Sequence, residues 1–181
     1  MIYFTSDTHY WHKTAIEYCR RPFATVEEMN EAMIERWNSR VKPDDSVYHL
    51  GDVCFAGKEK AHAILKRLNG QKFLIRGNHD KAFSDQWLSK YFTWVKDFYT
   101  LKVDDGLVCQ RIVLCHYALR TWEKIHHGAW HLFGHSHGTM KMIINPSMDV
   151  GVDCHNYFPI SYDEVDQKLS GLKFTATDCH D

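Results

Sequence analysis

Side chains that can bind divalent metals recur along the sequence, each directly after a short apolar run. The first cluster is Asp7-Thr8-His9, and the four later ones are Gly51-Asp52, Gly77-Asn78-His79-Asp80, His116 and Gly134-His135-Ser136-His137. Carboxylate and amide oxygens with imidazole nitrogens suit Mn²⁺, Fe, Zn²⁺ or Ni²⁺, whereas a soft site would use thiolates. The residue types therefore predict a site for divalent transition-metal ions.

These clusters need elements that bring them to one point. Apolar runs predict strands over 2–6, 46–50, 72–76, 94–103, 107–115, 130–133 and 148–152. Asp104-Asp105-Gly106 is a hairpin signal between two of these runs. Loops beyond the carboxyl ends of strands in an α/β sheet can bring ligands from distant parts of the chain together.

Helix signals lie between the predicted strands. Thr25 with Glu28 is a capping box that opens a helix over 25–41, and Ser161 with Glu164 opens a shorter one that ends near Gly171. Two further helices are predicted over 58–68 and 84–91. Alternating strands and helices with one hairpin predict a mixed α/β sandwich, in a single domain that spans 1–181.

Composition limits the classes of partner. The 181 residues include 44% hydrophobic and 25% charged residues, which is typical of a globular domain. The 22 basic and 23 acidic residues give a net charge of −1. Binding to duplex nucleic acid usually needs a basic excess, so no duplex partner is expected, whereas a small nucleotide or a single-stranded end stays open.

Neither a membrane span nor secretion is indicated. No apolar run approaches the roughly 18 residues needed to cross a bilayer, and the N-terminus lacks the pattern of a secretory signal. The six cysteines include no C-x-x-C pair. Reduced thiols in a cytoplasmic protein without a membrane partner are the expectation.

Taken in order, the five clusters resemble the motif set of calcineurin-like metallophosphoesterases, over residues 7 to 137. Within that superfamily the chain resembles small, capless bacterial and phage phosphoesterases, through three segments: Asp7-Thr8-His9-Tyr10-Trp11-His12, Arg21-Pro22-Phe23 and Val150-Gly151-Val152-Asp153. The resemblance implies a four-layer α/β/β/α sandwich with two mixed β-sheets.

The resemblance also implies a set of roles. One metal ion would be held by Asp7, His9, Asp52 and His137. A second would be held by Asp52, Asn78, His116 and His135, with the Asp52 carboxylate bridging both ions. His79 corresponds to the family's catalytic histidine and would be oriented by Asp80. The implied cofactors are two divalent transition-metal ions, with Mn²⁺ favoured over Fe, Zn²⁺ or Ni²⁺.

The implied activity is hydrolysis of phosphoester bonds. Two ions would lower the pKa of a bridging water, and the resulting hydroxide would attack phosphorus in line. His79 would steady the transition state or protonate the leaving alkoxide. A phosphodiester or a small nucleotide phosphate is the favoured substrate, because nothing in the chain resembles the extra segments of protein phosphatases.

Two alternatives come from other classes. A scaffold with this fold that binds without turnover usually loses ligands, and here no ligand position of the pattern is substituted. Gly134-His135-Ser136-His137-Gly138 also matches the G-x-S-x-G nucleophile elbow of serine hydrolases, with Ser136 as nucleophile. That alternative leaves Asp7, His9 and Asp52 unexplained.

Substrate contacts are predicted at His12, Arg76 and His155. His12 and His155 lie near ligand clusters in the sequence, and Arg76 is a phosphate anchor by chemistry. For Arg20 and Arg21 a solvated helix end is favoured over an anchor. Of the other histidines, His49 is expected to pack inside its strand, and surface or edge positions are expected for His62, His126, His127, His131 and His180.

Overall fold

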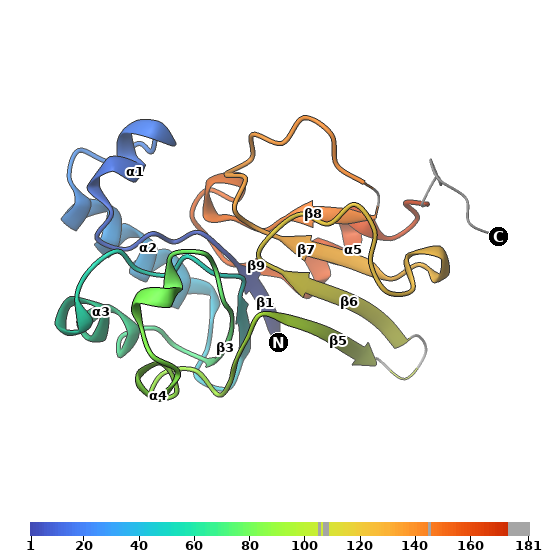
Figure 1. The fold of residues 1–181 in the computed structure, drawn as a ribbon, viewed down its shortest axis with the longest axis horizontal. Coiled ribbons are helices and arrows are strands. Elements are labelled where there is room, and N and C mark those ends of the chain that lie inside the picture. Colours follow the sequence, from blue (N-terminus) through green and yellow to red (C-terminus); the bar gives the residue numbers. More distant parts are fainter. Residues whose placement is uncertain (105, 107–108, 145, 174–181) are drawn as a thin grey trace.

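The computed structural model describes residues 1–104, 106, 109–144 and 146–173, and within them it contains two mixed β-sheets, with the helices of the N-terminal half at one end and the C-terminal helix beside the second sheet (Figure 1). The predicted positions of Asp105, Leu107, Val108 and His180 lie outside the described residues. The predicted class, a mixed α/β fold with two mixed sheets, is confirmed.

The first sheet carries three of the ligand clusters. Its strands, in spatial order, are β4 (Val95–Lys96), β3 (Gln71–Ile75), β2 (Ser46–His49), β1 (Ile2–Thr5) and β9 (Ile160–Ser161). The first four run parallel, and β9 pairs with β1 in the antiparallel sense. Parallel strands end at the same edge, so the turns after β1, β2 and β3 are neighbours.

The second sheet carries the other clusters. Its order is β5 (Phe98–Asp104), β6 (Cys109–Cys115), β7 (Trp130–Phe133) and β8 (Ser147–Asp149). Strands β5 and β6 pair antiparallel, with Asp104 opposite Cys109, as the hairpin signal predicts. Strands β6, β7 and β8 run parallel, so the turns after β6 and β7 are also neighbours.

Two strand predictions were wrong in their bounds. The single strand predicted over 94–103 is divided between the sheets, because β4 ends at Lys96 and β5 begins at Phe98. Asp97, a residue of low strand propensity, lies at the crossing. The strand predicted over 148–152 ends at Asp149, whose side-chain Oδ1 accepts a hydrogen bond of 2.7 Å from the Gly151 amide and so turns the chain.

Successive side chains on the strands point to opposite faces of the first sheet and so contribute to two hydrophobic cores. On β1, Phe4 faces the core between the sheets, where it packs with Ile112 and Leu132 of the second sheet. Tyr3 points the opposite way, into the core beneath the helices. Apolar burial on both faces of the first sheet therefore fixes the register that positions its loops.

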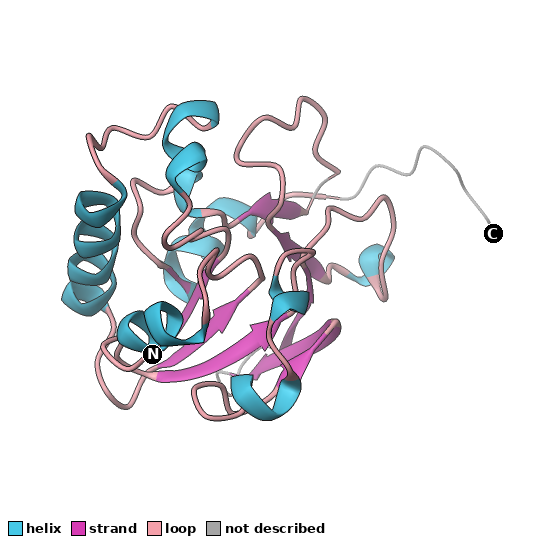
Figure 2. Cartoon of the chain, turned by 60° about the vertical axis from the view of Figure 1, so that its left-hand side comes forward, coloured by secondary structure: helices cyan, strands magenta, loops and turns pink. Residues whose placement is uncertain are grey.

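Among the described residues, five α-helices pack beside the sheets, and Figure 2 shows helices in cyan and strands in magenta. They are α1 (Lys13–Tyr18), α2 (Val26–Arg40), α3 (Lys58–Leu65), α4 (Asp85–Leu88) and α5 (Tyr162–Leu169). Both predicted caps are present: the Thr25 hydroxyl accepts from the Glu28 amide, and Ser161 and Glu164 form a capping box. Helix α4 is shorter than the predicted 84–91, and neither α1 nor β9 was predicted. Within the described part of the chain, no helix has the length and apolarity to cross a bilayer.

The outer face of the second sheet is covered by the segment 117–129, which includes a short 3₁₀ helix, Ile125–His127. Trp122 and Ile125 pack there against Val113 of β6. His131 of β7 faces this cover and is fully buried, so the prediction of a surface or edge position was wrong. Its Nδ1 lies 3.0 Å from the Val113 carbonyl, and its Nε2 accepts from the Leu119 amide at 3.0 Å.

Candidate metal centre

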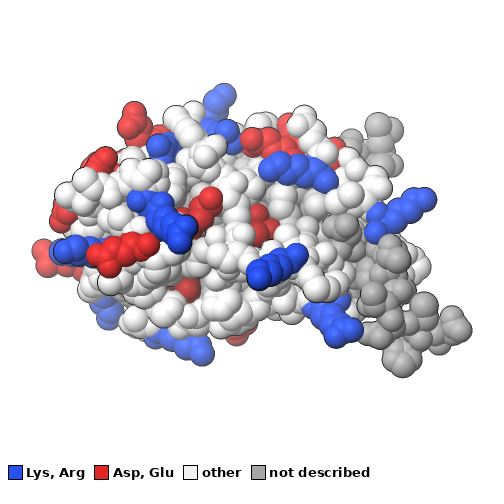
Figure 3. Space-filling view, turned by 90° about the horizontal axis from the view of Figure 1, so that it is seen from above, with Lys and Arg blue, Asp and Glu red and all other residues white. Residues whose placement is uncertain are grey.

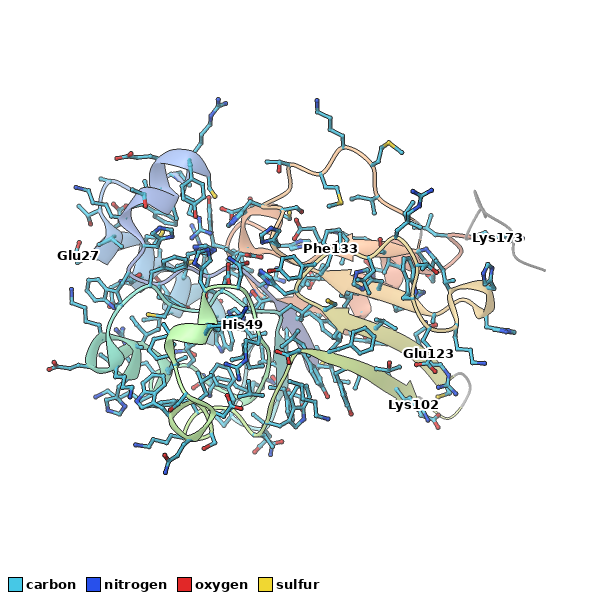
Figure 4. All side chains as sticks on the ribbon, in the orientation of Figure 1. Glu27, His49, Lys102, Glu123, Phe133 and Lys173 are labelled. Carbon is cyan, nitrogen blue, oxygen red and sulfur yellow. The ribbon has the colours of Figure 1, made fainter. Side chains whose placement is uncertain are left out.

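The seven predicted ligand side chains lie together where the strands of both sheets end. Figure 4 labels His49 and Phe133, the last residues of β2 and β7, in the central part of the molecule. The residues that follow these strands form two groups whose ligand atoms lie within 4.8 Å of one another: Asp7 with His9 and His137, and Asp52 with His116 and His135. Each group combines residues that follow strands of the first sheet with residues that follow strands of the second.

The first group contains buried atoms that need a partner. Asp7 Oδ1 lies 3.7 Å from His9 Nε2 and 3.9 Å from His137 Nε2, beyond hydrogen-bond range. Asp7 Oδ1 and His9 Nε2 are both buried without a hydrogen-bond partner. Buried polar atoms without partners are costly, so this arrangement fits an ion that binds to them.

The second group shares its carboxylate with the first. Asp52 Oδ2 lies 3.7 Å from His116 Nε2 and 3.6 Å from His9 Nε2. Asn78 Oδ1 lies 3.0 Å from His116 Nε2, which brings the amide oxygen into the same group. The Asp52 carboxylate therefore lies close to ligand atoms of both groups.

Most of the ligand residues have an unusual backbone conformation. Five of the seven have a positive φ: Asp7 (55°), His9 (49°), Asp52 (58°), His135 (65°) and His137 (46°). A left-handed conformation outside glycine costs of order 1–3 kcal/mol per residue and clusters at functional sites. Hydrogen bonds across the turns, including Asp7 N to the Gly51 carbonyl at 2.9 Å, hold this conformation in place.

Two glycines make room for the carboxylates. A Cβ atom at Gly77 would collide with Asp52 Oδ1, and one at Gly134 would collide with Asp7 Oδ2. Both glycines precede ligand residues, as the sequence pattern suggested.

Three imidazoles face the carboxylates through Nε2 and a second polar partner through Nδ1. His116 Nδ1 lies 2.6 Å from the Leu50 carbonyl, His9 Nδ1 lies 2.9 Å from His12 Nδ1, and His137 Nδ1 lies 2.7 Å from Asp153 Oδ2. A partner at Nδ1 fixes both the tautomer and the ring orientation of a metal-binding histidine.

Burial and neighbouring charges set the protonation of the group. Burial raises the pKa of Asp7, but contact with His9 and the charges of His116 and His137 outweigh it and lower this pKa to about 2. Burial lowers the pKa of His9 and of His135. An ionised carboxylate and neutral imidazoles are the forms that bind metal ions. Burial also lowers the pKa of His137, but contacts with Asp153 and Cys19 outweigh it and raise this pKa to about 10, so an ion that binds His137 would displace a proton.

His79 lies beside Asp52, but Asp80 does not orient it as predicted. The two Asp80 oxygens instead accept hydrogen bonds from the backbone amides of Asp52, Val53 and Gly77, at 2.8 to 3.0 Å. Asp80 therefore joins the turn after β2 to the turn after β3. Burial raises its pKa against the effect of these amides.

The His79 side chain is half-exposed, and its Nε2 lies 3.9 Å from Asp52 Oδ2. Its ring packs against Phe55, with centroids 4.4 Å apart. Phe55 also stacks on His9 at 4.7 Å and on His12 at 3.8 Å. No sequence signal marked Phe55, because a single aromatic residue after a ligand turn resembles any core residue.

The predicted substrate contacts have different surroundings. His12 lies at the site, where burial and the neighbouring His9 lower its pKa to about 4. Arg76 is paired with the exposed carboxylates of Asp85 and Asp97. His155 Nε2 lies 2.9 Å from the Asp149 carbonyl, and the residue lines a separate cavity of about 270 Å³.

Arg21 is buried, so the expectation of a solvated helix end was wrong for it. Its guanidinium contacts both carboxylate oxygens of Asp153 at 2.8 Å. Arg20 is exposed, as expected. No local pattern marks the buried pair, because 132 residues separate Arg21 from Asp153.

A cavity of about 650 Å³ opens beside the two ligand groups. Its lining includes His135 of one group and His137 of the other, together with Tyr18, Cys19, Arg20, Ser136 and Thr139. Ligand sites usually occupy about 300–1,000 Å³, so this cavity is large enough for a nucleotide-sized molecule next to the ligands.

Known proteins share this pattern. The family model of the calcineurin-like phosphoesterases matches residues 1–139, which include all seven predicted ligands. The chain belongs to the calcineurin-like phosphoesterase family. Metal-dependent hydrolysis of phosphoesters is the general activity of this family.

Proteins similar to this calcineurin-like phosphoesterase are found in an archaeon, a bacterium and a phage. An uncharacterised protein of Methanocaldococcus jannaschii is 35% identical over 97% of this chain and 95% of its own length. The Gene 66 protein of Mycobacterium phage D29 is 28% identical over 95% of this chain and 97% of its own. A solved structure from Aquifex aeolicus, of a protein of unknown function, is 26% identical with a TM-score of 0.71, covering 92% of this chain and 98% of that one.

Proposed function

We propose that this protein hydrolyses phosphoester bonds with two divalent metal ions. One observation carries the proposal: the buried Asp52 carboxylate lies close to ligand atoms of both groups, one of which contains unpartnered buried atoms. Asp7, His9, Asp52 and His137 would hold one ion, and Asp52, Asn78, His116 and His135 would hold the other. Oxygen and imidazole donors suit Mn²⁺, which we favour over Fe, Zn²⁺ and Ni²⁺.

Bound at these positions, the ions would act as Lewis acids and supply a nucleophile from water near neutral pH. The chain itself contributes orientation and proton transfer. Asp52 is held through Oδ1, which accepts from the His79 amide at 3.0 Å, so its Oδ2 stays directed at His9 and His116. The half-exposed His79 imidazole would donate a proton to the leaving alkoxide or steady the transition state.

The cavity beside His135 and His137 favours a phosphodiester or a small nucleotide phosphate. A phosphoryl group that reaches the ligands leaves the rest of the substrate in that cavity, next to Tyr18 and Arg20. On the face shown in Figure 3, basic and acidic side chains are interspersed, so that face lacks the basic stripe that duplex binding uses.

The test is hydrolysis of bis-p-nitrophenyl phosphate and of p-nitrophenyl phosphate by chelated protein, with Mn²⁺, Ni²⁺, Zn²⁺ or Mg²⁺ added back. We expect turnover that metal restores and that Asp52→Ala abolishes, with the diester preferred. Two bound ions per chain without turnover on either ester or on nucleotides would instead identify a binding scaffold and overturn the proposal.

A further inference from the structure

Two sequence segments that the proposed chemistry does not use meet beside the metal centre. Arg21 belongs to Arg21-Pro22-Phe23, and Asp153 belongs to Val150-Gly151-Val152-Asp153. Arg21 Nε and Nη2 each lie 2.8 Å from a different oxygen of the Asp153 carboxylate. The Arg21 side chain is fully buried, and that of Asp153 is 8% exposed. A two-point contact of this kind fixes the carboxylate in orientation as well as in position.

The same carboxylate reaches a proposed ligand. Asp153 Oδ2 lies 2.7 Å from His137 Nδ1, while His137 Nε2 faces Asp7 Oδ1 at 3.9 Å. With Nδ1 bonded to Asp153, Nε2 is the ring nitrogen that is left to bind an ion, in exchange for its proton. Carboxylate–histidine–metal chains of this kind tune the affinity of metal sites.

Arg21 also holds the turn that carries the other ligands of the first group. Its Nη2 donates to the Asp7 carbonyl at 2.7 Å, and its Nη1 donates to the Thr8 carbonyl at 3.0 Å. One guanidinium therefore connects the backbone between Asp7 and His9 to the carboxylate behind His137. Asp7 and His9 follow β1 of the first sheet, whereas His137 follows β7 of the second.

We propose that Arg21 and Asp153 are positioning residues for the first metal ion, and that the second ion does not depend on them. The inference rests on the proposed function. It adds a positioning residue, Asp153, that lies beyond residue 139, where the match to the family model ends. His116 has its own Nδ1 partner, the Leu50 carbonyl, so the second group keeps its orientation without the pair.

The first experiment measures metal affinity rather than turnover. Zn²⁺ is titrated into chelated wild type, Asp153→Asn and Arg21→Lys, with calorimetry and a competing chelator. In both variants we expect the Zn²⁺ affinity of one of the two sites to fall about 10–100-fold, which is the usual effect of removing a hydrogen-bond partner of a metal-binding histidine. The Zn²⁺ affinity of the other site should stay unchanged. His137→Gln should weaken the affected site more strongly.

The matched control is Arg40→Gln. Arg40 also pairs with a carboxylate, Glu164 at 3.0 Å, but this pair is partly exposed and contacts no proposed ligand. Both Zn²⁺ sites should keep wild-type affinity in this variant. Equal weakening of both sites in Asp153→Asn, or no weakening in either pair variant, would overturn the inference.

A second measurement needs no variant of the pair. In ¹⁵N-labelled wild type loaded with Zn²⁺, His137 should show a protonated Nδ1 and a metal-bound Nε2 in ring N–H correlation spectra. A metal-bound Nδ1 would overturn the inference even if the variants fail to fold. Wild type that binds no Zn²⁺, or only one ion, would instead contradict the proposed function.

Discussion

At the residue scale, the ligand positions combine metal-binding side chains with a backbone conformation that those side chains disfavour. Asp7, Asp52 and His137 all have a left-handed φ, a conformation that is uncommon outside glycine. Such strain persists only where surrounding contacts hold it, and here they include the bond from the His9 amide to the Asp52 carbonyl at 3.0 Å. The turns are therefore organised around the ligands.

Replacing His79 by alanine should separate chemistry from metal binding. We expect His79→Ala to lose about 10²–10⁴-fold in turnover, the usual contribution of a general acid, and to retain both ions. Metal should stay because His79 contacts Asp52 Oδ1 through its backbone amide, which alanine keeps. Turnover assays are paired with metal analysis by mass spectrometry, and loss of an ion would show that His79 is a ligand.

Ser136→Ala distinguishes the metal site from a serine nucleophile. The Ser136 hydroxyl donates to Asp149 Oδ2 at 2.6 Å, and the Gly138 amide donates to the same oxygen at 3.0 Å. We expect nearly unchanged turnover and a loss of about 1 kcal/mol in the free energy of unfolding, since one hydrogen bond is removed. Activity as low as that of Asp52→Ala would support the serine hydrolase instead.

The clusters that the structure brings together could be recognised because four of the five carry their polar residues locally, in a turn of two to four residues, and the ligand role of the lone His116 came from the family resemblance. The residues that contact the ligands and hold them in place could not be predicted in this way. Arg21 reaches Asp153 across 132 residues, and the contact of Asp52 with Asp80 spans 28. Asp80 lies next to His79 in the sequence, but its carboxylate turns toward three backbone amides that converge there and donate to it.

At the element scale, the turns after the strands depend on glycine residues, which have no side chain to collide with the ligands. Gly134→Ala should destabilise the fold by about 1–3 kcal/mol and weaken metal binding, because its Cβ would collide with Ser6 and Asp7 Oδ2. Gly57→Ala is the matched control, since it lies at the start of α3 with no atom within 4 Å of a new Cβ. Urea unfolding and Zn²⁺ titration measure both effects, and equal behaviour of the two variants would contradict this reasoning.

The elements that carry local signals were predicted best. Helices α2 and α5 begin at the predicted capping residues Thr25 and Ser161. The division of 94–103 between two sheets was not predictable, because apolar side chains continue on both sides of Asp97 and only tertiary pairing decides which sheet each part joins. Strand β9 has two residues, too few for any periodic pattern.

At the scale of the whole molecule, metal binding should stabilise the fold by linkage. Free metal at about 100 times the dissociation constant adds about 2.7 kcal/mol per site, which corresponds to about 5–10 °C in melting temperature for a chain of this size. Thermal unfolding of chelated and Mn²⁺-loaded protein measures the shift. Asp52→Ala should lose most of it, and an equal shift in that variant would place the ions elsewhere.

The buried His131 predicts a stability that falls in acid. Burial lowers its pKa from the ordinary 6.5 to about 4. Below pH 6.5 the unfolded chain gains a proton at His131 that the folded chain does not bind, so folding stability falls until pH 4, by at most about 3 kcal/mol. Urea unfolding between pH 7 and 4 should show that His131→Gln loses less free energy of unfolding than wild type. Parallel curves for the two proteins would show that His131 is not the cause of the acid destabilisation.

Each ligand group draws on both sheets, and the chain crosses from the first sheet to the second at Asp97. A polypeptide divided at that crossing would give one piece with Asp7, His9 and Asp52 and another with His116, His135 and His137. Neither piece would contain a complete group. Metal binding would then require the two pieces to associate, so a metal-binding assay would measure their association.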